Sequence, residues 1–389
     1  MKHKKQFETE AIRTQSERTQ FLEHSTPMYL TSSFVFEDAE DMRASFAEEK
    51  EHNIYSRYSN PNSTEFVEKV CKMEGAEAGF SFASGMAAVF STFAALLESG
   101  DHIVSAKSIF GSTHTLFTQF FPKWNIGTSY FDINDLGEIE KLITPTTKII
   151  YAESPTNPGV DVLDLEALGN IAKKHNLIFI VDNCFASPYL QQPIKFGADL
   201  VIHSGTKLMD GQGRVLAGVT VGNSYLVDKI YRFSRITGPA LSPFNAWVLS
   251  KSLETLALRV DKHCTNALRL AEYLEDHKKI EWVKYPFLKS HPKYEIAKKQ
   301  MKAGGCVVAF EVKGGLEAGR KFFDAIKMLS LSANLGDSRS IVTHPASTTH
   351  SKLTKEERES VGISDGMVRI SVGLEHIDDI IADIKQALE

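Results

Sequence analysis

The chain has 389 residues, of which 42% are hydrophobic and 24% charged, and this composition excludes a mainly disordered, collagen-like or coiled-coil protein. With 44 Lys and Arg against 49 Asp and Glu, the net charge of −5 offers no basic surface for nucleic acid or an anionic membrane. No apolar run is long enough to span a bilayer, and none follows the basic N-terminus as in a signal peptide. The cysteines are few and far apart, which disfavours a disulfide framework, so we expect a cytoplasmic protein.

Residues 1–60 are polar and poorly periodic, so we expect an N-terminal arm that packs on another surface, such as a neighbouring subunit. From about residue 66, short apolar runs alternate with amphipathic segments, which indicates strands alternating with helices. We expect strands at His102–Ala106, Ser129–Asp132, Lys148–Glu153, Ile178–Asp182, Leu200–His203 and Ala217–Val221. One helix between them is expected at Asp164–His175, with Asp164 as its N-cap. This alternation predicts an α/β fold whose large domain is a mostly parallel sheet covered on both faces.

After Pro243 the pattern changes, because apolar residues recur at steps of three and four from Leu249 to Leu274, which predicts one long helical segment. A smaller α+β domain is expected to follow this segment. Its elements are a strand at Cys306–Val312, a helix at Leu316–Met328, a strand at Met367–Val372 and a helix at Ile377–Leu388. We therefore divide the chain into the arm at 1–60, a large domain at 61–245 and a small domain at 246–389.

Two polar segments directly follow predicted strands, Asp182-Asn183-Cys184 and Ser204-Gly205-Thr206-Lys207. Ligands of open α/β sheets bind at this edge. A lysine held among small residues there would be partly desolvated, which favours the neutral amine and Schiff-base chemistry. Asp182 ends an apolar strand, where a carboxylate is unusual unless it meets a cation such as a protonated pyridine nitrogen. The pair is typical of pyridoxal 5′-phosphate (PLP) enzymes. Alone, Asp182 could be a turn residue and Lys207 a solvated surface lysine.

A phosphate site is expected where Ser84–Val89 opens a helix that runs to about Glu98. Gly85 would allow the backbone close to a ligand, and the free N–H groups at a helix start attract anions. Ser204 and Thr206 could add hydroxyl donors, and the guanidinium of Arg57 could bind the phosphate through two N–H groups. A plain N-cap explains Ser84 equally well.

Three other motifs lack the context that their chemistry needs. Gly211–Leu216 is similar to the GxGxxG dinucleotide motif but has Leu in place of the third glycine. Ser204–Lys207 matches the S-x-x-K acylation motif, but neither S-D-N nor K-T-G follows it. His344 and His350 are six residues apart with a proline between them, which favours a loop near a pocket over a zinc site. We therefore expect no metal.

Several stretches match one known family in the same order along the chain. They are Tyr55–Pro61, Ser84–Ala88, Glu153–Pro158, Val181–Asn183, Ser204–Lys207 and Arg369–Glu375. Together they resemble the PLP-dependent enzymes of cysteine and methionine metabolism, and the resemblance extends from about Tyr29 to Glu389. It implies PLP as the cofactor, the type I aspartate-aminotransferase fold, and a homotetramer built as a dimer of dimers.

The resemblance also implies a role for individual residues. Lys207 would form the Schiff base and Asp182 would contact the pyridine nitrogen. The cofactor phosphate would be held by Gly85, Met86, Ser204 and Thr206, with Tyr55 and Arg57 contributed by the neighbouring subunit, and Tyr55 is also expected to be catalytic. Asn157 and Arg369 would hold the α-carboxylate of an amino-acid substrate, with Asn334 nearby.

Many members of this family place a Tyr over the cofactor ring where this chain has Phe110. Together with Asp210–Arg214 and Asn334–Asp337, Phe110 makes the chain most similar to the O-succinylhomoserine sulfhydrylases. The expected reaction is therefore γ-replacement on O-succinylhomoserine with sulfide, which yields homocysteine and succinate for methionine biosynthesis. The alternatives are a cystathionine γ-synthase or O-acetylhomoserine sulfhydrylase, then a methionine γ-lyase. A non-catalytic PLP-binding protein is disfavoured, because it would not need Lys207, Asp182 and Arg369 together.

Overall fold

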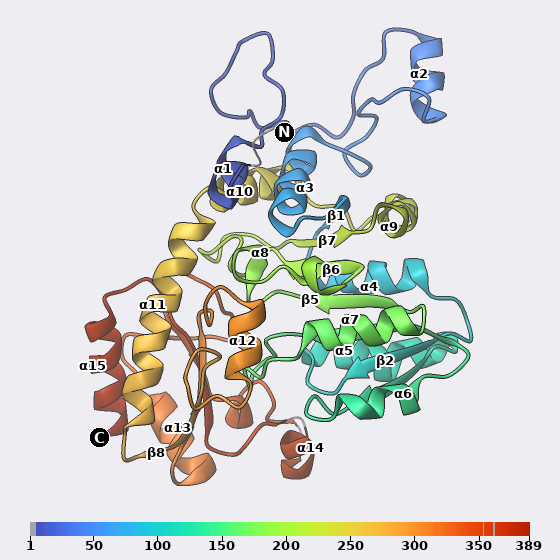
Figure 1. The fold of residues 1–389 in the computed structure, drawn as a ribbon. Coiled ribbons are helices and arrows are strands. Elements are labelled where there is room, and N and C mark those ends of the chain that lie inside the picture. The colour runs from blue at the N-terminus through green and yellow to red at the C-terminus, as the bar shows by residue number, and fades with distance from the viewer. Residues whose placement is uncertain (1–4, 353, 361) are drawn as a thin grey trace.

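A seven-stranded sheet forms the centre of the large part of the molecule (Figure 1). In this computed structural model the described residues are 5–352, 354–360 and 362–389. The strands are β1 Ala78–Phe82, β2 His102–Ala106, β3 Gly127–Phe131, β4 Thr147–Glu153, β5 Ile178–Asp182, β6 Leu200–Ser204 and β7 Gly218–Gly222. Their order is β1-β7-β6-β5-β4-β2-β3, and β7 is antiparallel to both of its neighbours while the remaining pairs are parallel. The predicted mostly parallel sheet is confirmed.

Each strand expected in this sheet is present within two residues of its predicted bounds, but sequence periodicity missed β1. The β1 sequence AGFSF has little of the β-branched character that marks a strand. Its small residues serve close packing instead. A Cβ at Gly79 would lie 2.7 Å from Cγ1 of Val221 on the neighbouring strand, so the contact between β1 and β7 requires a glycine.

Helices and short turns connect the strands and pack around this sheet (Figure 1). The longer helices are α3 Pro61–Glu74, α4 Gly85–Leu96, α7 Leu165–Lys174, α9 Ser224–Thr237 and α10 Pro243–Leu253. The short helical pieces are α5 Gly111–Thr115, α6 Ile139–Leu142 and α8 Ser187–Leu190, a π turn at Leu116–Phe120, and 3₁₀ turns at Phe121–Trp124, Leu136–Glu138 and Pro193–Phe196. Asp164 caps α7 by accepting from the N–H of Ala167 at 3.0 Å, as predicted. No helix in the described ranges combines the length and apolarity that crossing a membrane requires.

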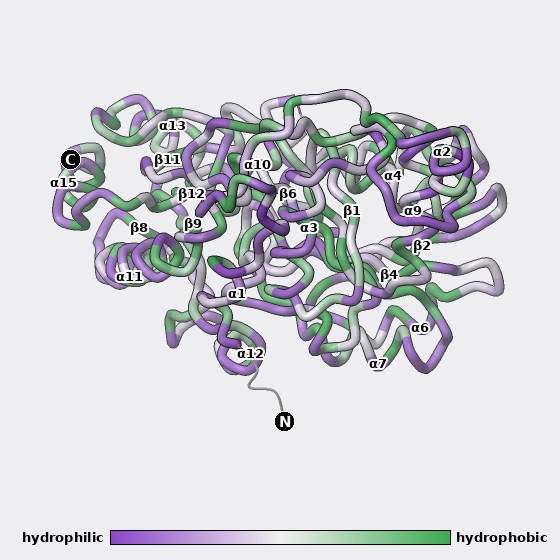
Figure 2. Tube along the Cα trace, turned by 90° about the horizontal axis from the view of Figure 1, so that it is seen from above, coloured by the Kyte–Doolittle hydropathy of each residue, from purple (hydrophilic) through white to green (hydrophobic). Residues whose placement is uncertain are grey.

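A second, five-stranded sheet lies beside the first, and the two sheets occupy opposite sides of the view in Figure 2. Its strands are β8 Ile280–Lys284, β9 Val307–Val312, β10 Ser330–Leu331, β11 Ile341–Thr343 and β12 Met367–Ser371, in the order β10-β11-β12-β9-β8. The accompanying helices are α12 Tyr294–Gln300, α13 Gly315–Ala325, α14 Lys355–Ser360 and α15 Ile377–Leu388, with a 3₁₀ turn at Pro345–Ser347. The predicted smaller α+β unit is therefore present.

Helix α13 ends three residues before the predicted Met328. The cause is the carboxylate of Asp383 on α15, which accepts the backbone N–H groups of Lys327, Met328 and Leu329 at 2.9–3.0 Å. These three N–H groups therefore donate to a residue distant in sequence and do not continue the hydrogen bonds of the helix. Local periodicity contains no sign of this contact.

The predicted continuous helix over Leu249–Leu274 is wrong, because the chain turns at Glu254 and Thr255 between α10 and α11 Leu256–Glu275. The carbonyl of Ser252 accepts from the N–H and hydroxyl of Thr255, each at 3.2 Å, and from Nη2 of Arg259 at 2.9 Å. These bonds replace the next hydrogen bond of the α-helical ladder. The apolar periodicity continues across the break because apolar residues of both helices, such as Leu249 and Val260, pack in the core of the large sheet.

Helix α11 links the cores of the two parts. Val260 and Cys264 pack in the core of the large sheet, whereas Leu270 and Leu274 pack in the core of the second sheet. Figure 1 shows α11 running from α10 toward α15 and β8. A domain boundary near residue 245 stays a prediction.

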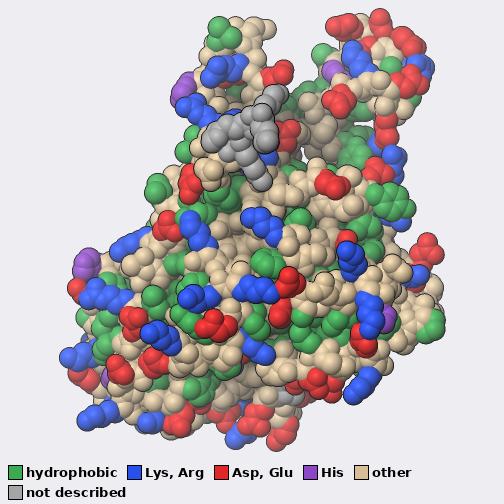
Figure 3. Space-filling view, in the orientation of Figure 1, with side chains coloured by type: hydrophobic (Ala, Val, Ile, Leu, Met, Phe, Trp, Pro, Cys, Tyr) green, Lys and Arg blue, Asp and Glu red, His purple; other side chains and the backbone are tan. Residues whose placement is uncertain are grey.

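The N-terminal arm contains two short helices, α1 Phe7–Arg13 and α2 Ala39–Phe46, and its residues 1–4 lie outside the described part. The base of the arm is fixed to α3, because Glu65 accepts from the N–H of Ser16 at 2.9 Å and from the hydroxyl of Thr26 at 2.5 Å. Two projections stand above the body of the molecule in Figure 3. Apolar side chains such as Phe21 and Val35 are more than four-fifths exposed. Contact between the arm and another subunit stays a prediction.

Candidate active site

A cavity of about 700 Å³ lies at the carboxyl ends of β4, β5 and β6. The last residue of each strand, Glu153, Asp182 and Ser204, lines it. The start of α4 forms one wall, and β11 and β12 of the second sheet contribute Thr343 and Arg369. The cavity brings together nine of the predicted site residues: Gly85, Met86, Phe110, Asn157, Asp182, Ser204, Thr206, Lys207 and Arg369.

Lys207 lies in the turn that follows β6, and its Nζ donates to Oδ1 of Asn334 at 2.5 Å. Burial lowers the pKa of Lys207, and the nearby charge of Arg369 lowers it further against the opposing effect of Cys184. A lowered pKa increases the fraction of neutral amine at physiological pH. Lys207 can therefore act as a nucleophile toward a carbonyl group and as a base toward a substrate proton.

Two carboxyl groups, the half-buried Asp182 and the buried Glu153, lie side by side as register partners on β5 and β4. Burial raises the pKa of Asp182 to about 6, although the N–H of Cys184 donates to it at 3.0 Å. Burial and then the charge of Asp182 raise the pKa of Glu153 well above its usual range. Within the described ranges neither carboxyl group pairs with a Lys, Arg or His side chain at ion-pair distance. Above about pH 6 the Asp182 carboxylate therefore carries an unpaired negative charge that would bind a cationic ring nitrogen.

The start of α4 offers an anion site beside these carboxyl groups. The Ser84 hydroxyl accepts from the N–H of Ala87 at 3.1 Å, so Ser84 is the N-cap. A Cβ at Gly85 would lie 2.8 Å from Cβ of Ser204, so the glycine is what brings the helix start against the end of β6. The hydroxyl of Thr206 bonds with the backbone of Ala217 and also lines the cavity. Free N–H groups and hydroxyls of this kind suit a phosphate.

Arg369 on β12 supplies a buried cation on the opposite wall, with 5% of its surface exposed. Its Nη1 donates to Oδ1 of Asn157 at 2.8 Å, and its Nη2 donates to the carbonyl of Asn334 at 3.0 Å. Its Nε is buried without a hydrogen-bond partner among the described residues. A buried donor without an acceptor costs free energy, so this guanidinium fits a substrate carboxylate.

Tyr55 and Arg57 do not line this cavity. They line a separate, smaller pocket with Leu30 and Gly238. Arg57 donates to the carbonyl of Arg235, and its guanidinium lies 4.8 Å from the centre of the Tyr58 ring. A single chain therefore does not bring these two residues to the site that holds Lys207.

The sequence pattern of the Cys/Met metabolism PLP-dependent enzymes matches residues 8–389. The chain belongs to this family. It is 45% identical over 382 residues to an O-succinylhomoserine sulfhydrylase of Pseudomonas aeruginosa, with 98% of this chain and 95% of the relative covered. It is 44% identical over 367 residues to an L-methionine gamma-lyase of Fusobacterium nucleatum, with 93% of each covered.

A solved structure with a similar fold is that of a protein assigned as an O-acetylhomoserine (thiol)-lyase of Campylobacter jejuni. The TM-score is 0.93 at 37% identity, and the match covers 98% of this chain and 99% of the other. That protein carries a pyridoxyl-lysine phosphate. The predicted family, PLP cofactor and fold are confirmed, and the cavity fits PLP because an amine, an anion site and surplus carboxylate charge meet in it.

Several residues that line the cavity of this PLP-dependent enzyme were not predicted from its sequence. Glu153 lay within a matched stretch, and its position as the last residue of a strand was the available signal. Lys352 and Thr349 gave no signal, because they come from a loop that only the fold carries to the cavity. His350 also lines the cavity, so the expectation of a loop near a pocket is confirmed.

The raised pKa of Asp182 predicts how the stability of the PLP-free protein depends on pH. The folded apoprotein binds the Asp182 proton more tightly than the unfolded chain, so its contribution is complete below about pH 4 and is lost as the pH rises through about 6. Between about pH 5 and pH 7.5, the apoprotein should lose about 1 to 2 kcal/mol of unfolding free energy relative to Asp182→Asn. Urea unfolding measures this difference. Asp276→Asn, at an exposed site, is the control. If unfolding free energy depends on pH in the same way for wild type and Asp182→Asn, the pKa of Asp182 is not raised.

Proposed function

We propose that this enzyme catalyses γ-replacement on O-succinylhomoserine, in which sulfide displaces succinate to give homocysteine. The observation that carries the proposal is a single cavity that combines Lys207, the Asp182 and Glu153 pair, and Arg369 with its unpartnered Nε. Similarity to O-succinylhomoserine sulfhydrylases over nearly the whole chain supports the choice of reaction. The proposed pathway role is methionine biosynthesis.

In this proposal the residues of the chain bind the substrate and move its protons. Arg369, held by Asn157, binds the α-carboxylate through two parallel N–H donors. Lys207 Nζ takes the proton from Cα, since its lowered pKa leaves it able to act as a base. Asp182 holds the pyridine nitrogen and Gly85, Met86, Ser204 and Thr206 hold the phosphate. When bound, PLP supplies an electron sink for the charge that develops on the substrate carbons.

The bond changes of the reaction balance without a redox partner. After the Cα proton, a proton also leaves Cβ, the bond between Cγ and the ester oxygen breaks, and succinate leaves with the electron pair. Sulfide forms the new bond to Cγ, and the protons returned to Cβ and Cα restore the amino acid. Because succinate is a stable anion, its departure needs little proton donation, which fits a ring at position 110 that has no hydroxyl.

The loop at 349–352 supports succinyl as the acyl group. Lys352 and His350 line the same cavity as Arg369. A succinyl ester ends in a second carboxylate, whereas an acetyl ester ends in a methyl group. A cation at the cavity wall therefore favours the succinyl ester electrostatically.

Methionine γ-lyase is the second candidate, because a lyase is nearly as similar to this chain, at 44% identity, as a sulfhydrylase is, at 45%. Loss of a thiolate from methionine would gain more from a proton donor over the ring than loss of succinate does. The side chain at position 110 therefore favours the sulfhydrylase.

We also propose a homotetramer in which Tyr55, as a catalytic and phosphate-binding residue, and Arg57 serve the cavity of a neighbouring chain.

The first test compares two reactions of the purified enzyme. We expect homocysteine formation from O-succinylhomoserine and sulfide to be much faster than 2-oxobutyrate release from methionine. Phe110→Tyr should shift the ratio toward 2-oxobutyrate, because its phenol can donate a proton to the departing sulfur. Lys207→Ala is the inactive control. If wild type cleaves methionine as readily as it thiolates the ester, the lyase assignment replaces the sulfhydrylase assignment.

The second test concerns the succinyl group. Lys352→Met should raise KM for O-succinylhomoserine about three- to ten-fold, as loss of a solvent-exposed charge pair would, and leave KM for O-acetylhomoserine nearly unchanged. Lys355→Met is the matched control, since Lys355 lies nearby in sequence and its ammonium is 3.4 Å from Asp365 instead. If Lys352→Met raises KM for both esters equally, Lys352 does not recognise the succinyl group.

The third test concerns the subunits. Arg57→Ala and Lys207→Ala should each be inactive, but hybrid dimers would contain one site with both groups intact. A randomised equal mixture should therefore recover up to about a quarter of wild-type activity per subunit. Each variant carried through the same exchange alone provides the control. Absence of recovery after verified exchange would place Arg57 outside the neighbour's site.

A further inference from the structure

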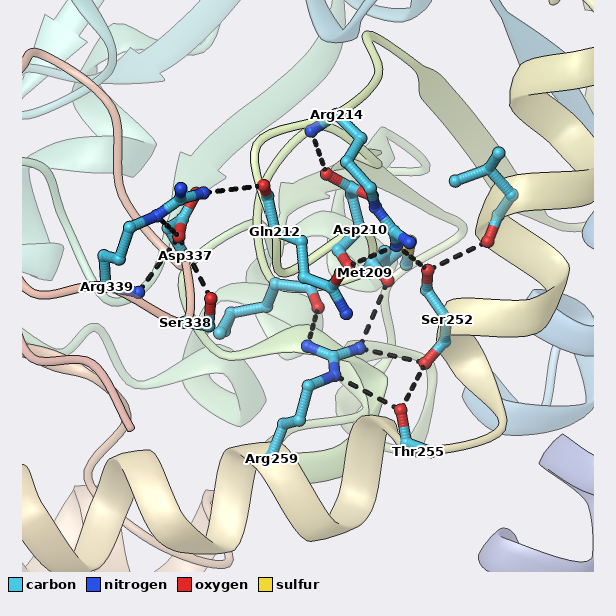
Figure 4. Close-up of polar contacts among 12 residues, drawn as sticks. Met209, Asp210, Gln212, Arg214, Ser252, Thr255, Arg259, Asp337, Ser338 and Arg339 are labelled. Atoms are coloured by element: carbon cyan, nitrogen blue, oxygen red, sulfur yellow. Dashed lines mark hydrogen bonds and ion pairs between the residues drawn. The ribbon is translucent and has the colours of Figure 1, made fainter. Parts of the chain in front are cut away.

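The guanidinium of a buried arginine donates hydrogen bonds to the backbone of the turn that carries Lys207 (Figure 4). Arg259, in the first turn of α11, donates from Nη1 to the carbonyl of Leu208 at 2.8 Å. Its Nη2 donates to the carbonyl of Met209 at 3.3 Å and to that of Ser252 at 2.9 Å. The guanidinium therefore binds the two residues that directly follow Lys207 and ties them to the junction of α10 and α11.

Arg259 is only 8% exposed, and in the described part of the chain no carboxylate pairs with it at ion-pair distance. Its acceptors are backbone carbonyls, together with the hydroxyl of Thr255 at 3.4 Å from Nε. Burial lowers the pKa of Arg259 to about 10, against the stabilising charge of Asp210. A buried cation with neutral acceptors is an expensive way to stabilise a fold. An apolar side chain would fill the space at lower cost but could not orient two carbonyls.

The turn is shaped to receive this guanidinium. Gly211 has φ of +68°, and a Cβ there would lie 2.0 Å from Nη1 of Arg259. The carbonyl of Lys207 accepts from the N–H of Gly211 at 2.8 Å, which closes the turn. Arg259 thus packs against the same residue that fixes the backbone of Lys207.

On its other side the turn is held by the second part of the chain. The N–H of Ser338 donates to the carbonyl of Gly211 at 2.8 Å. Figure 4 shows the second bond, in which Nη2 of Arg339 donates to the carbonyl of Gln212 at 2.9 Å. The same segment begins with Asn334, whose side chain binds Nζ of Lys207 and whose carbonyl binds Arg369. A shift of the turn would therefore move Lys207 relative to the carboxylate site.

We propose that Arg259 is a positioning residue for Lys207, which holds the turn so that Nζ points to Asn334 and into the cavity. This inference rests on the proposed role of Lys207. Arg259 does not touch the cavity, so it acts through the carbonyls of Leu208 and Met209. Without the guanidinium these carbonyls lose their partners, and the backbone from which Lys207 extends loses its support.

The test uses the PLP-loaded enzyme with Arg259→Gln and Arg259→Lys. Arg269→Gln is the control, because Arg269 lies on the same helix in an exposed ion pair with Asp378. We measure the pH titration of the visible band of Lys207-bound PLP, the rate of PLP release after dilution, and kcat separately from KM. Arg259→Gln should release PLP at least ten-fold faster, shift the titration midpoint and lower kcat more than it raises KM. Arg259→Lys should give a smaller effect than Arg259→Gln, because it keeps a positive charge and N–H donors. Some effect should remain, since an ammonium lacks the planar set of donors that binds both carbonyls.

Circular dichroism and the elution volume establish that each variant is folded. A folded Arg259→Gln enzyme that matches Arg269→Gln in titration and PLP release would overturn the proposal. If Arg259→Gln does not fold, Arg259→Lys decides, and wild-type titration and release in that variant would equally refute it. Absence of a reducible Lys207 band in wild type would instead contradict the proposed function. Binding of PLP to Lys207 requires no substrate, so the two failures are distinguishable.

Discussion

The arrangement of the site depends on burying ionisable groups where parallel strands end. Asp182 and Glu153 lie on adjacent strands, and neither has a cation at ion-pair distance among the described residues. Desolvation raises the pKa of both carboxyl groups and lowers that of Lys207. Burial strengthens the attraction between the Asp182 carboxylate and a cationic ring, and it makes the lysine a usable nucleophile and base. A site open to water would lose both effects.

The two parts of the chain meet at this cavity, and Asn334 connects them. Its side chain accepts from Nζ of Lys207, and its carbonyl accepts from Arg369. Lys207 follows a strand of the large sheet, whereas Arg369 belongs to the second sheet. The distance between the base and the carboxylate-binding group is therefore set by packing between the two parts. Helix α11, whose two ends lie in different cores, provides a rigid connection for that packing.

The strands and the residues at their ends could be predicted from sequence, because burial on both faces leaves apolar runs that stop at polar residues such as Asp182. Features set by contacts distant in sequence could not. Asp383 ends α13 early, and Arg259 with Thr255 interrupts the helix that periodicity continued. Within the site, Asp182 and Lys207 of the large part and Arg369 of the second sheet were predicted from motifs, whereas Glu153 was not. Lys352 was not predicted either, because it reaches the cavity through a loop whose path no local pattern encodes.

The glycines of Gly211–Leu216 illustrate the same limit in a motif. Their spacing is similar to that of a dinucleotide-binding loop, and the absence of the third glycine and of a following helix excluded that use. The structure gives each glycine a different reason: Gly211 makes room for the guanidinium of Arg259, and a Cβ at Gly213 would lie 2.6 Å from Oδ2 of Asp337. Both have positive φ, so the loop can turn tightly between two buried or half-buried polar groups. Gly211 and Gly213 therefore mark the places where the side chains of Arg259 and Asp337 approach the turn that carries Lys207, and a glycine pattern has functional meaning only once its neighbours are known.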